Sequence, residues 1–405
     1  MIYTKRERVI QTLMHKEADM VPIDFASTRS TGINALAYYK LKEYLKFHGK
    51  IKIFDLKQLL ALPEKDTLNF FQTDCIQLHR LAPSAGLKIN QWRSEIMLDG
   101  NEYEIPANYN PLKLPDGSHA IVDSNNNILL KRPKGGLYFD DVYAQLADAS
   151  SNEEIDNFIY PCILEEDLSY LKKEAEHLYN KTDYAIVATV GVSIVEKGIK
   201  DFGYEEFLVK IYTDKELVTR YLENLTDAYI KLLDKYLDAI GQYIQVLYFN
   251  DDLGMQTGPL MAPEKYREIF KPYHKRIFSY VKKKAPNVFI LLHSCGSIYD
   301  VIPDLIDAGV DAINPVQINA NKMDPVILKR EFGKDLTFWG GGCSTQTTLT
   351  FGSIKDIQDE VKRMIDIFSP NGGFIFNQVH NIQSNISPEK IIALYKTAIE
   401  NRKYL

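Results

Sequence analysis

Hydrophobic residues along this chain recur in short runs separated by longer amphipathic stretches. Eight of the runs are typical of buried strands, because they are apolar without alternation and are rich in β-branched or aromatic residues. They cover residues 21–26, 73–79, 184–190, 244–249, 288–292, 311–314, 336–339 and 373–377. Amphipathic stretches predict helices at 5–17, 34–48, 205–240, 264–284, 354–368 and 388–402. This alternation predicts an α/β protein, and eight such units favour a closed (β/α)8 TIM barrel over an open sheet.

Residues 87–139 follow a different pattern. Turn signals such as Pro115-Asp116-Gly117 separate short alternating runs, which is typical of β-hairpins. We therefore expect a single barrel domain over residues 1–405 with a β-hairpin-rich insertion at 87–139. No Gly-x-Gly-x-x-Gly motif opens a helix after a predicted strand, which argues against a dinucleotide-binding fold.

Composition narrows the class of protein. The 405 residues are 45% hydrophobic and 25% charged, which is ordinary for a globular protein, and the formal net charge of −6 gives no reason to expect nucleic acid or an anionic membrane as partner. No apolar run is long enough to span a bilayer, and the charged first residues do not resemble a signal peptide. Four cysteines in so long a chain do not form a disulfide framework. We expect a cytoplasmic protein with free thiols.

Polar residues gather where the predicted strands end. In a (β/α)8 barrel, catalytic residues come from the C-terminal ends of several strands. Five consecutive strands of this chain end in such residues, namely Asn250, Asp251 and Asp252; His293 and Cys295; Asn314 and Gln317; Gly340-Gly341-Gly342-Cys343; and Asn377, Gln378 and His380. The sequence therefore predicts an active site at this rim.

The tripeptide His293-Ser294-Cys295 is the most specific of these signals. Side chains at positions i and i+2 of a strand point the same way, so the imidazole and the thiol converge. They form half of a zinc site, although a buried cysteine beside a capping histidine gives the same tripeptide. Cys343 is either a small residue in a tight turn or a third ligand. His380 is either a ligand or a partner for a backbone carbonyl.

Arg29 lies in the loop of residues 27–32 after the first predicted strand. Its guanidinium suits a substrate carboxylate or phosphate, because it binds such groups bidentately. A surface arginine or an ion-paired arginine is an equal alternative.

Four motifs together carry a resemblance to a known family. They are Arg6-Glu7-Arg8-Val9-Ile10, the segment 251–260 that begins Asp251-Asp252-Leu253-Gly254, His293-Ser294-Cys295-Gly296, and Val379-His380-Asn381-Ile382-Gln383 followed by Ser387-Pro388-Glu389. The chain resembles the uroporphyrinogen decarboxylase superfamily nearly from end to end. That resemblance implies a (β/α)8 barrel with its site in the mouth. It also implies one of two chemistries: metal-free decarboxylation of the acetate arms of a tetrapyrrole, or zinc-dependent methyl transfer between corrinoid proteins and small donors or thiol acceptors.

The early loop and the His-x-Cys motif separate these two branches. The decarboxylases carry two arginines four residues apart in that loop, whereas this chain has only Arg29. The methyltransferases use His-x-Cys as zinc ligands, which implies that His293 and Cys295 bind zinc. Their third ligand is a cysteine on the last strand, where this chain has His380 in the position of a decarboxylase histidine. We expect Cys343, one strand earlier, to supply the missing sulfur.

The sequence thus predicts a zinc-dependent methyltransferase that moves a methyl group between a small-molecule donor or acceptor and a corrinoid (cobalamin) carried by a partner protein. No cobalamin-binding domain is recognisable in the chain, so we expect the corrinoid on that partner. The resemblance makes a homodimer one option for the assembly. The expected metal ligands are His293, Cys295 and Cys343, the expected catalytic residues are Asp251, Asp252 and His380, and the expected substrate-binding residues are Arg29, Asn314, Gln317 and Asn377.

Two alternatives remain open at this point. One is a metal-independent decarboxylase of a small carboxylic acid or a tetrapyrrole, with Asp251 as general acid or base and Arg29 as the clamp. The other is a non-catalytic scaffold or chaperone for a corrinoid protein. Metal content distinguishes the decarboxylase from the methyltransferase. A scaffold or chaperone would still bind its partner after substitution of His293 and Cys295.

Overall fold

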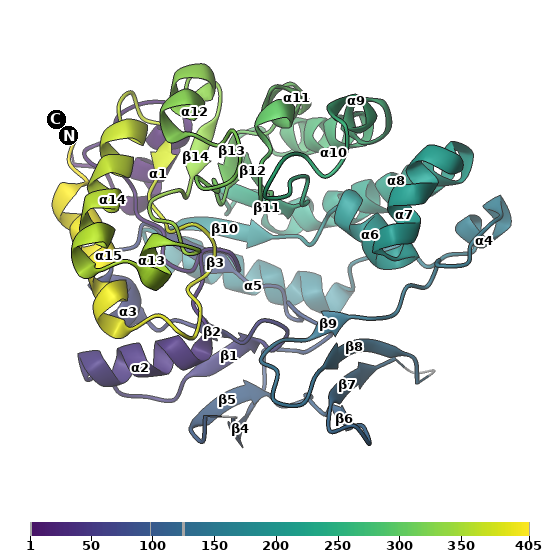
Figure 1. The fold of residues 1–405 in the computed structure, drawn as a ribbon, viewed down its shortest axis with the longest axis horizontal. Helices are drawn as coiled ribbons and strands as arrows, with labels where there is room; N and C mark the ends of the chain where they lie inside the picture. The colour runs from purple at the N-terminus through teal and green to yellow at the C-terminus, as the bar shows by residue number, and fades with distance from the viewer. Residues whose placement is uncertain (1, 98, 124–125, 405) are drawn as a thin grey trace.

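A parallel barrel forms the centre of the molecule. The computed structural model describes residues 2–97, 99–123 and 126–404. Seven parallel strands form one curved sheet in the order β15-β14-β13-β12-β11-β10-β3 (Figure 1). Their bounds are β3 (Cys75–Leu78), β10 (Ala185–Thr189), β11 (Val246–Asn250), β12 (Phe289–His293), β13 (Ala312–Asn314), β14 (Thr337–Trp339) and β15 (Phe374–Ile375). Each overlaps one of the predicted strands, and β11 and β12 extend one residue beyond the predicted ends, to Asn250 and His293.

The eighth predicted strand, residues 21–26, joins the two edges of this sheet. Ile23 forms a parallel bridge with Phe376 beyond β15, and its carbonyl oxygen accepts a hydrogen bond of 2.7 Å from the backbone N–H of Asp74 before β3. Pro22 has no N–H to donate, which restricts the pairing to an isolated bridge. The prediction of a (β/α)8 barrel is confirmed.

Helices cover the outside of the barrel. Their bounds are α1 (Lys5–Leu13), α2 (Ala35–Leu45), α3 (Lys65–Phe70), α4 (Asn152–Asp156), α5 (Glu165–Lys181), α6 (Val195–Phe202), α7 (Tyr204–Thr213), α8 (Lys215–Ile240), α9 (Pro263–Lys265), η1 (Tyr266–Phe270), α10 (Lys271–Lys284), η2 (Tyr299–Val301), α11 (Ile302–Ala308), α12 (Pro325–Phe332), α13 (Thr348–Phe351), α14 (Ile354–Phe368) and α15 (Pro388–Asn401). Helix α8 is typical, because apolar residues three and four positions apart form its buried face.

Two predicted helices differ in detail. The helix expected over 205–240 is divided into α7 and α8 at Asp214, whose side chain accepts a hydrogen bond from the backbone N–H of Leu217 and so caps α8. The helix expected over 264–284 contains the π-turn η1, and Pro272 follows two residues after its end. A proline ring clashes with the carbonyl four residues earlier in a regular α-helix, and the wider turn relieves that clash.

The barrel interior is packed with side chains. Residues at alternate positions of the strands, including Val187, Leu291 and Trp339, form one buried apolar cluster with Val9 and Leu13 of α1. Helix α1 therefore closes the base of the barrel, and any cavity must lie at the opposite, C-terminal end of the strands.

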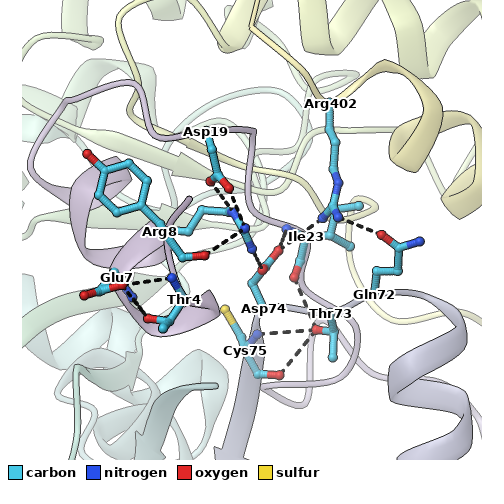
Figure 2. Close-up of polar contacts among 11 residues, drawn as sticks. Thr4, Glu7, Arg8, Asp19, Ile23, Gln72, Thr73, Asp74, Cys75 and Arg402 are labelled. Atoms are coloured by element: carbon cyan, nitrogen blue, oxygen red, sulfur yellow. Dashed lines mark hydrogen bonds and ion pairs between the residues drawn. The ribbon is translucent and has the colours of Figure 1, made fainter. Parts of the chain in front are cut away.

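A base network of Arg8, Asp19, Asp74 and Arg402 holds the two ends of the chain together (Figure 2). The guanidinium of Arg8 pairs with Asp19 at 2.8 Å and with Asp74, and Arg402 lies 3.5 Å from Asp74. The Asp74 carboxylate also accepts a hydrogen bond of 2.8 Å from the backbone N–H of Ile23, which fixes the short eighth strand.

Two small sheets lie to one side of the barrel (below it in Figure 1). One has the order β2-β1-β5-β4 and the other β6-β7-β8-β9. Their strands are β1 (Lys52–Asp55), β2 (Leu60–Leu62), β4 (Trp92–Ile96), β5 (Glu102–Pro106), β6 (Leu112–Lys113), β7 (His119–Val122), β8 (Ile128–Arg132) and β9 (Asp140–Asp141). Strands β4 to β8 fall within 87–139, whereas β1 and β2 precede that range and β9 follows it. The division into one domain with an insertion stays a prediction.

No helix built from the described residues is both long and apolar enough to cross a lipid bilayer.

Candidate active site and metal-binding group

A cavity of about 630 Å³ opens at the C-terminal ends of the barrel strands. Its floor is formed by strand-end residues, namely Gln77 of β3, Thr189 of β10, Tyr248 and Asn250 of β11, and His293 of β12. The loop that carries Arg29 and the first turns of α6 form its walls. The structure thus places a cavity at the rim where the sequence predicts the site.

Three side chains in this region form a group that can hold a metal ion. Ligand atoms of His293, Cys295 and His380, which we call the His/Cys group, all lie within 4.8 Å of one another. The Sγ atom of Cys295 is 3.3 Å from Nε2 of His293, as the alternation of a strand predicts. Gly296 follows with a φ of +80°, and a Cβ atom there would lie 2.6 Å from the backbone of Gly254. Only glycine permits the chain to turn at this point.

The imidazole of His293 is oriented by Asn314. Nδ1 of His293 lies 2.8 Å from Oδ1 of Asn314, while Nδ2 of the same amide donates to the carbonyl oxygen of Trp339 at 2.8 Å. Because the amide nitrogen is engaged elsewhere, Oδ1 is the acceptor and Nδ1 of His293 carries the proton. The lone pair of Nε2 then faces the Cys295 thiol, which is the tautomer that binds a metal.

Acidic neighbours surround Cys295. Its backbone N–H donates to Oδ1 of Asp252 at 2.7 Å, and the same oxygen is 3.7 Å from Nε2 of His293. Burial, followed by the charges of Asp252 and Glu196, raises the pKa of the Cys295 thiol. A thiolate at this position therefore needs a cation beside it, which fits a bound zinc ion.

His380 completes the His/Cys group. Its ring centroid lies 5.7 Å from that of His293, and its Nδ1 is 2.9 Å from Oδ1 of Asn381. Burial, followed by the charge of His293, lowers the pKa of His380 to about 4. The imidazole of His380 is thus suited to the neutral form in which histidine binds metal.

Cys343, the expected third ligand, lies outside this group. It is fully buried, its thiol faces Glu360, and burial followed by the charge of Glu360 raises its pKa. Gly340 and Gly341 adopt positive φ values of 126° and 73°, so the chain leaves the extended course that would have carried Cys343 to the rim. Of the residues the structure describes, His380 takes the place beside His293 and Cys295 that the sequence assigns to Cys343.

The two adjacent acids predicted as catalytic have different surroundings. Asp251 is buried, and its carboxylate accepts hydrogen bonds of 2.7–2.9 Å from the backbone N–H groups of Ile194, Val195 and Glu196. It also lies 2.9 Å from Nε2 of His274. Asp251 therefore caps the start of α6 and does not line the cavity. Asp252 does line it, and its side chain is 44% exposed.

Of the predicted substrate-binding residues, too, some line the cavity and others are buried away from it. Arg29 lines the cavity and is one-third exposed, although its Nε lies 2.8 Å from Oδ2 of Asp55. Asn314 and Asn377 are fully buried, and neither lines the cavity. Gln317 holds the loop after β12, because its Oε1 accepts a hydrogen bond of 2.8 Å from the backbone N–H of Gly296.

Glu196 of α6 is a cavity residue that the sequence analysis did not identify. Its carboxylate accepts a hydrogen bond from Nδ2 of Asn250. Burial, followed by the charges of Asp252 and Asp251, raises the pKa of Glu196 to about 8. No motif marks it, but α6 begins five residues after Val190, so its first turn had to lie at the rim.

Basic residues at the cavity mouth were also missed. They come from the loops around β1 and β3 and from α6, and comprise Lys57, Arg80, Lys197 and Lys200. Each has a carboxylate partner, such as Asp167 at 2.5 Å from Arg80 and Asp141 at 3.1 Å from Lys200. These residues have no periodicity that would group them in the sequence.

Comparison with known proteins gives a family match and several curated relatives. Residues 188–400 match the model of the uroporphyrinogen decarboxylase (URO-D) family. A uroporphyrinogen decarboxylase of Geobacter sp. (strain M21) is 25% identical over 206 residues, which cover 50% of this chain and 55% of that protein. That of Chlorobium limicola is 23% identical over 261 residues, covering 60% and 67%. The chain spans about half the length of the first of these curated relatives.

A solved structure shares the fold over nearly the whole chain. It is a methyltransferase from Methanosarcina mazei, 17% identical in sequence, with a TM-score of 0.58. The superposition covers 98% of this chain and 99% of that one.

Proposed function

This chain belongs to the uroporphyrinogen decarboxylase family, and within that family we propose that it is a zinc-dependent methyltransferase. It would move a methyl group between a small molecule and a corrinoid carried by a separate protein. The observation that carries this proposal is the His/Cys group, in which Nε2 of His293 faces the thiol of Cys295 at 3.3 Å with His380 beside them. The solved methyltransferase of similar fold supports the same branch of chemistry.

The residues of the site have distinct roles in this proposal. His293, Cys295 and His380 hold the ion, and Asn314 keeps Nε2 of His293 unprotonated. Asp252 positions Cys295 through its backbone N–H. When bound, zinc supplies Lewis-acid chemistry and lowers the pKa of a thiol in its coordination sphere. The cavity of about 630 Å³ is large enough for a small substrate beside this group.

A decarboxylase is the second candidate, because the curated relatives are named uroporphyrinogen decarboxylases. In that case Asp252 and not Asp251 would be the acid or base, since Asp251 is engaged by the backbone of α6. Arg29 would contact the substrate carboxylate. The lack of a second arginine in the Arg29 loop disfavours a substrate with many carboxylates.

Zinc content of the purified full-length chain tests the proposal. We expect about one zinc ion per chain by mass spectrometry of the metal, because three protein ligands with an open position form a catalytic zinc site. Cys295→Ser and His380→Ala should each reduce occupancy severalfold. Cys343→Ser is the matched control, since it also replaces a buried thiol but should leave the zinc content unchanged.

A second measurement addresses the methyl transfer itself. Zinc-loaded protein should demethylate free methylcobalamin in the presence of a small thiol, which is followed by the absorbance change of the corrinoid. A chain that takes up no zinc at equilibrium, or a Cys343→Ser variant that loses it, would contradict the assignment of ligands made here. A chain that releases CO₂ from a carboxylic acid without any metal would favour the decarboxylase.

A further inference from the structure

The inner end of the cavity carries two carboxylates without a basic partner. Glu196 accepts a hydrogen bond from the neutral amide of Asn250. Asp252 accepts one of 2.7 Å from the backbone N–H of Cys295 and lies 3.7 Å from Nε2 of His293. Neither forms an ion pair with a lysine or an arginine in the part of the chain that the structure describes. Glu196 is partly buried, and burying a carboxylate without compensation is unfavourable, so a cation is the expected occupant of the space beside it.

The mouth of the cavity contrasts with its inner end. Every basic side chain that lines it already has a carboxylate neighbour, as in the pairs Arg29 with Asp55, Arg80 with Asp167, and Lys197 with Asp201. The basic residues of the mouth therefore do not neutralise Glu196 and Asp252. The uncompensated negative charge is local to the end of the cavity beside the His/Cys group.

The floor also holds an acceptor without a hydrogen-bond partner among the described residues. Oε1 of Gln77 is buried without a hydrogen-bond partner, while Nε2 of the same amide donates to Oγ1 of Thr189 at 3.2 Å. Gln77 is 7% exposed and lines the cavity. An orphaned acceptor and two carboxylates together suit a ligand that brings several N–H donors, and an ammonium group has three.

We infer that the small molecule handled at this site is a thiol or thioether that carries a positively charged ammonium group, which Glu196 and Asp252 bind. This inference rests on the proposed function, since it assumes that the sulfur atom lies beside the His/Cys group. Asp252 already contacts that group through the 3.7 Å approach to His293, so one small molecule can reach both. An anionic thiol would instead bring a negative charge beside Asp252 and Glu196, neither of which pairs with a lysine or an arginine among the described residues.

The elevated pKa of Glu196, about 8, agrees with this assignment. Burial and two neighbouring carboxylates disfavour the ionised form of Glu196, and a cationic group beside it would favour that form.

A matched pair of probes tests the inference. 2-(Methylthio)ethylamine and 3-(methylthio)propanoate have the same spacer and the same thioether, and differ in the charge of the far group. Thioethers chelate zinc weakly, so neither should strip a bound metal. We expect the amine to bind the full-length chain at least tenfold more tightly by isothermal titration calorimetry, with and without zinc. Equal affinity, or tighter binding of the carboxylate, would overturn the inference.

Substitutions identify which residues cause the preference for the amine probe. Glu196→Gln keeps the shape and the hydrogen bond with Asn250 but removes the charge, and should weaken binding of the amine about tenfold while leaving the carboxylate unaffected. Asp252→Asn is the second variant, in case Glu196→Gln does not fold. Glu205→Gln, an exposed glutamate on α7, is the control and should bind both probes as the wild type does. An unchanged amine affinity in both cavity variants would overturn the inference.

Zinc content of the same samples separates the two proposals. Full zinc occupancy without amine preference overturns the ammonium assignment and leaves the methyltransferase intact. Amine preference that is lost in Glu196→Gln supports the ammonium-binding residues, even in a chain whose failure to bind zinc overturns the proposed function.

Discussion

At the scale of single residues, the His/Cys group is held by a neutral amide and surrounded by acids. Oδ1 of Asn314 accepts a hydrogen bond from Nδ1–H of His293 and another, of 2.5 Å, from Oγ of Ser30. An amide fixes the ring without adding charge, whereas a carboxylate in its place would make the region still more negative. The carboxyl groups near the His/Cys group are instead those of Asp252 and Glu196, which face the cavity.

Asn314→Leu tests the role of this amide. The substitution keeps the branching of the side chain but removes the acceptor for Nδ1, so the ring can rotate or change tautomer. We expect zinc affinity to fall by about 10- to 100-fold, measured by competition with a chelator. Ser30→Ala is the control, because it removes another hydrogen bond to the same oxygen and leaves that of His293 in place. Equal losses in the two variants would mean that Asn314 acts through general packing.

The sequence predicts some of these residues and not others, for reasons visible at each position. His293 and Cys295 follow from the two-residue repeat of a strand, which is local geometry. Cys343 does not reach the group because positive φ values at Gly340 and Gly341 turn the chain, and one sequence does not disclose how three glycines are used. His380 itself has a φ of 64°, which no spacing rule indicates.

At the scale of elements, the start of α6 is the piece that shapes the inner end of the cavity. Asp251 binds three successive backbone N–H groups there, and Nε2 of His274 lies 2.9 Å from its carboxylate. The hydroxyl of Tyr266 lies 3.0 Å from the other nitrogen of His274, so η1 and α10 support β11 and α6 together. Through this chain of contacts Asp251 positions Glu196 without touching the cavity.

Asp251→Asn should therefore weaken α6 more than an ordinary cap substitution does. The new NH₂ group would face backbone N–H donors, and we expect the free energy of unfolding to fall by about 2 to 4 kcal/mol. Hydrogen exchange should become faster at residues 194–202 before the barrel strands are affected. Asp214→Asn at the start of α8 is the control, with an expected loss of no more than about 0.5 kcal/mol, since that cap makes one backbone hydrogen bond and asparagine caps a helix about as well as aspartate. Comparable losses at the two caps would contradict the special role of Asp251.

Regular elements were predictable because their signals are periodic, and the exceptions have local causes. The strand and helix order follows from runs of apolar residues, as in β11 and α8. The division at Asp214 and the π-turn before Pro272 depend on one residue each, which an average over a window does not resolve. The start of α6 was missed for the same reason, since its eight residues give too short a periodic signal.

At the scale of the whole molecule, the two ends of the barrel differ: the base carries a network that stabilises the fold, and the mouth carries the candidate site. The mouth holds the His/Cys group and two carboxyl groups without a lysine or arginine partner among the described residues, whereas the base network compensates its own charges (Figure 2). Asp74 is the centre of that network, because it contacts Arg8 near the first helix, Ile23 in the short eighth strand and Arg402 near the chain end. Closing the barrel thus depends on one carboxylate that sequence reasoning did not single out.

Asp74→Ala should accordingly destabilise the whole barrel without altering the site. Removing the carboxylate leaves Arg402 buried with only the amide of Gln72 as a polar side-chain partner, and frees the backbone N–H of Ile23. We expect the free energy of unfolding in urea to fall by about 3 to 5 kcal/mol, the usual result of breaking a buried pair. Asp359→Ala breaks an exposed pair with Lys355 and should change it by no more than about 0.5 kcal/mol.

A second measurement on the same variant concerns the site. Zinc uptake by folded Asp74→Ala protein should match the wild type, because the network and the His/Cys group lie at opposite ends of the strands. Loss of zinc binding in folded variant protein would show that the two ends are coupled, and a small loss of stability would show that the eighth strand is held mainly by its bridge to Phe376.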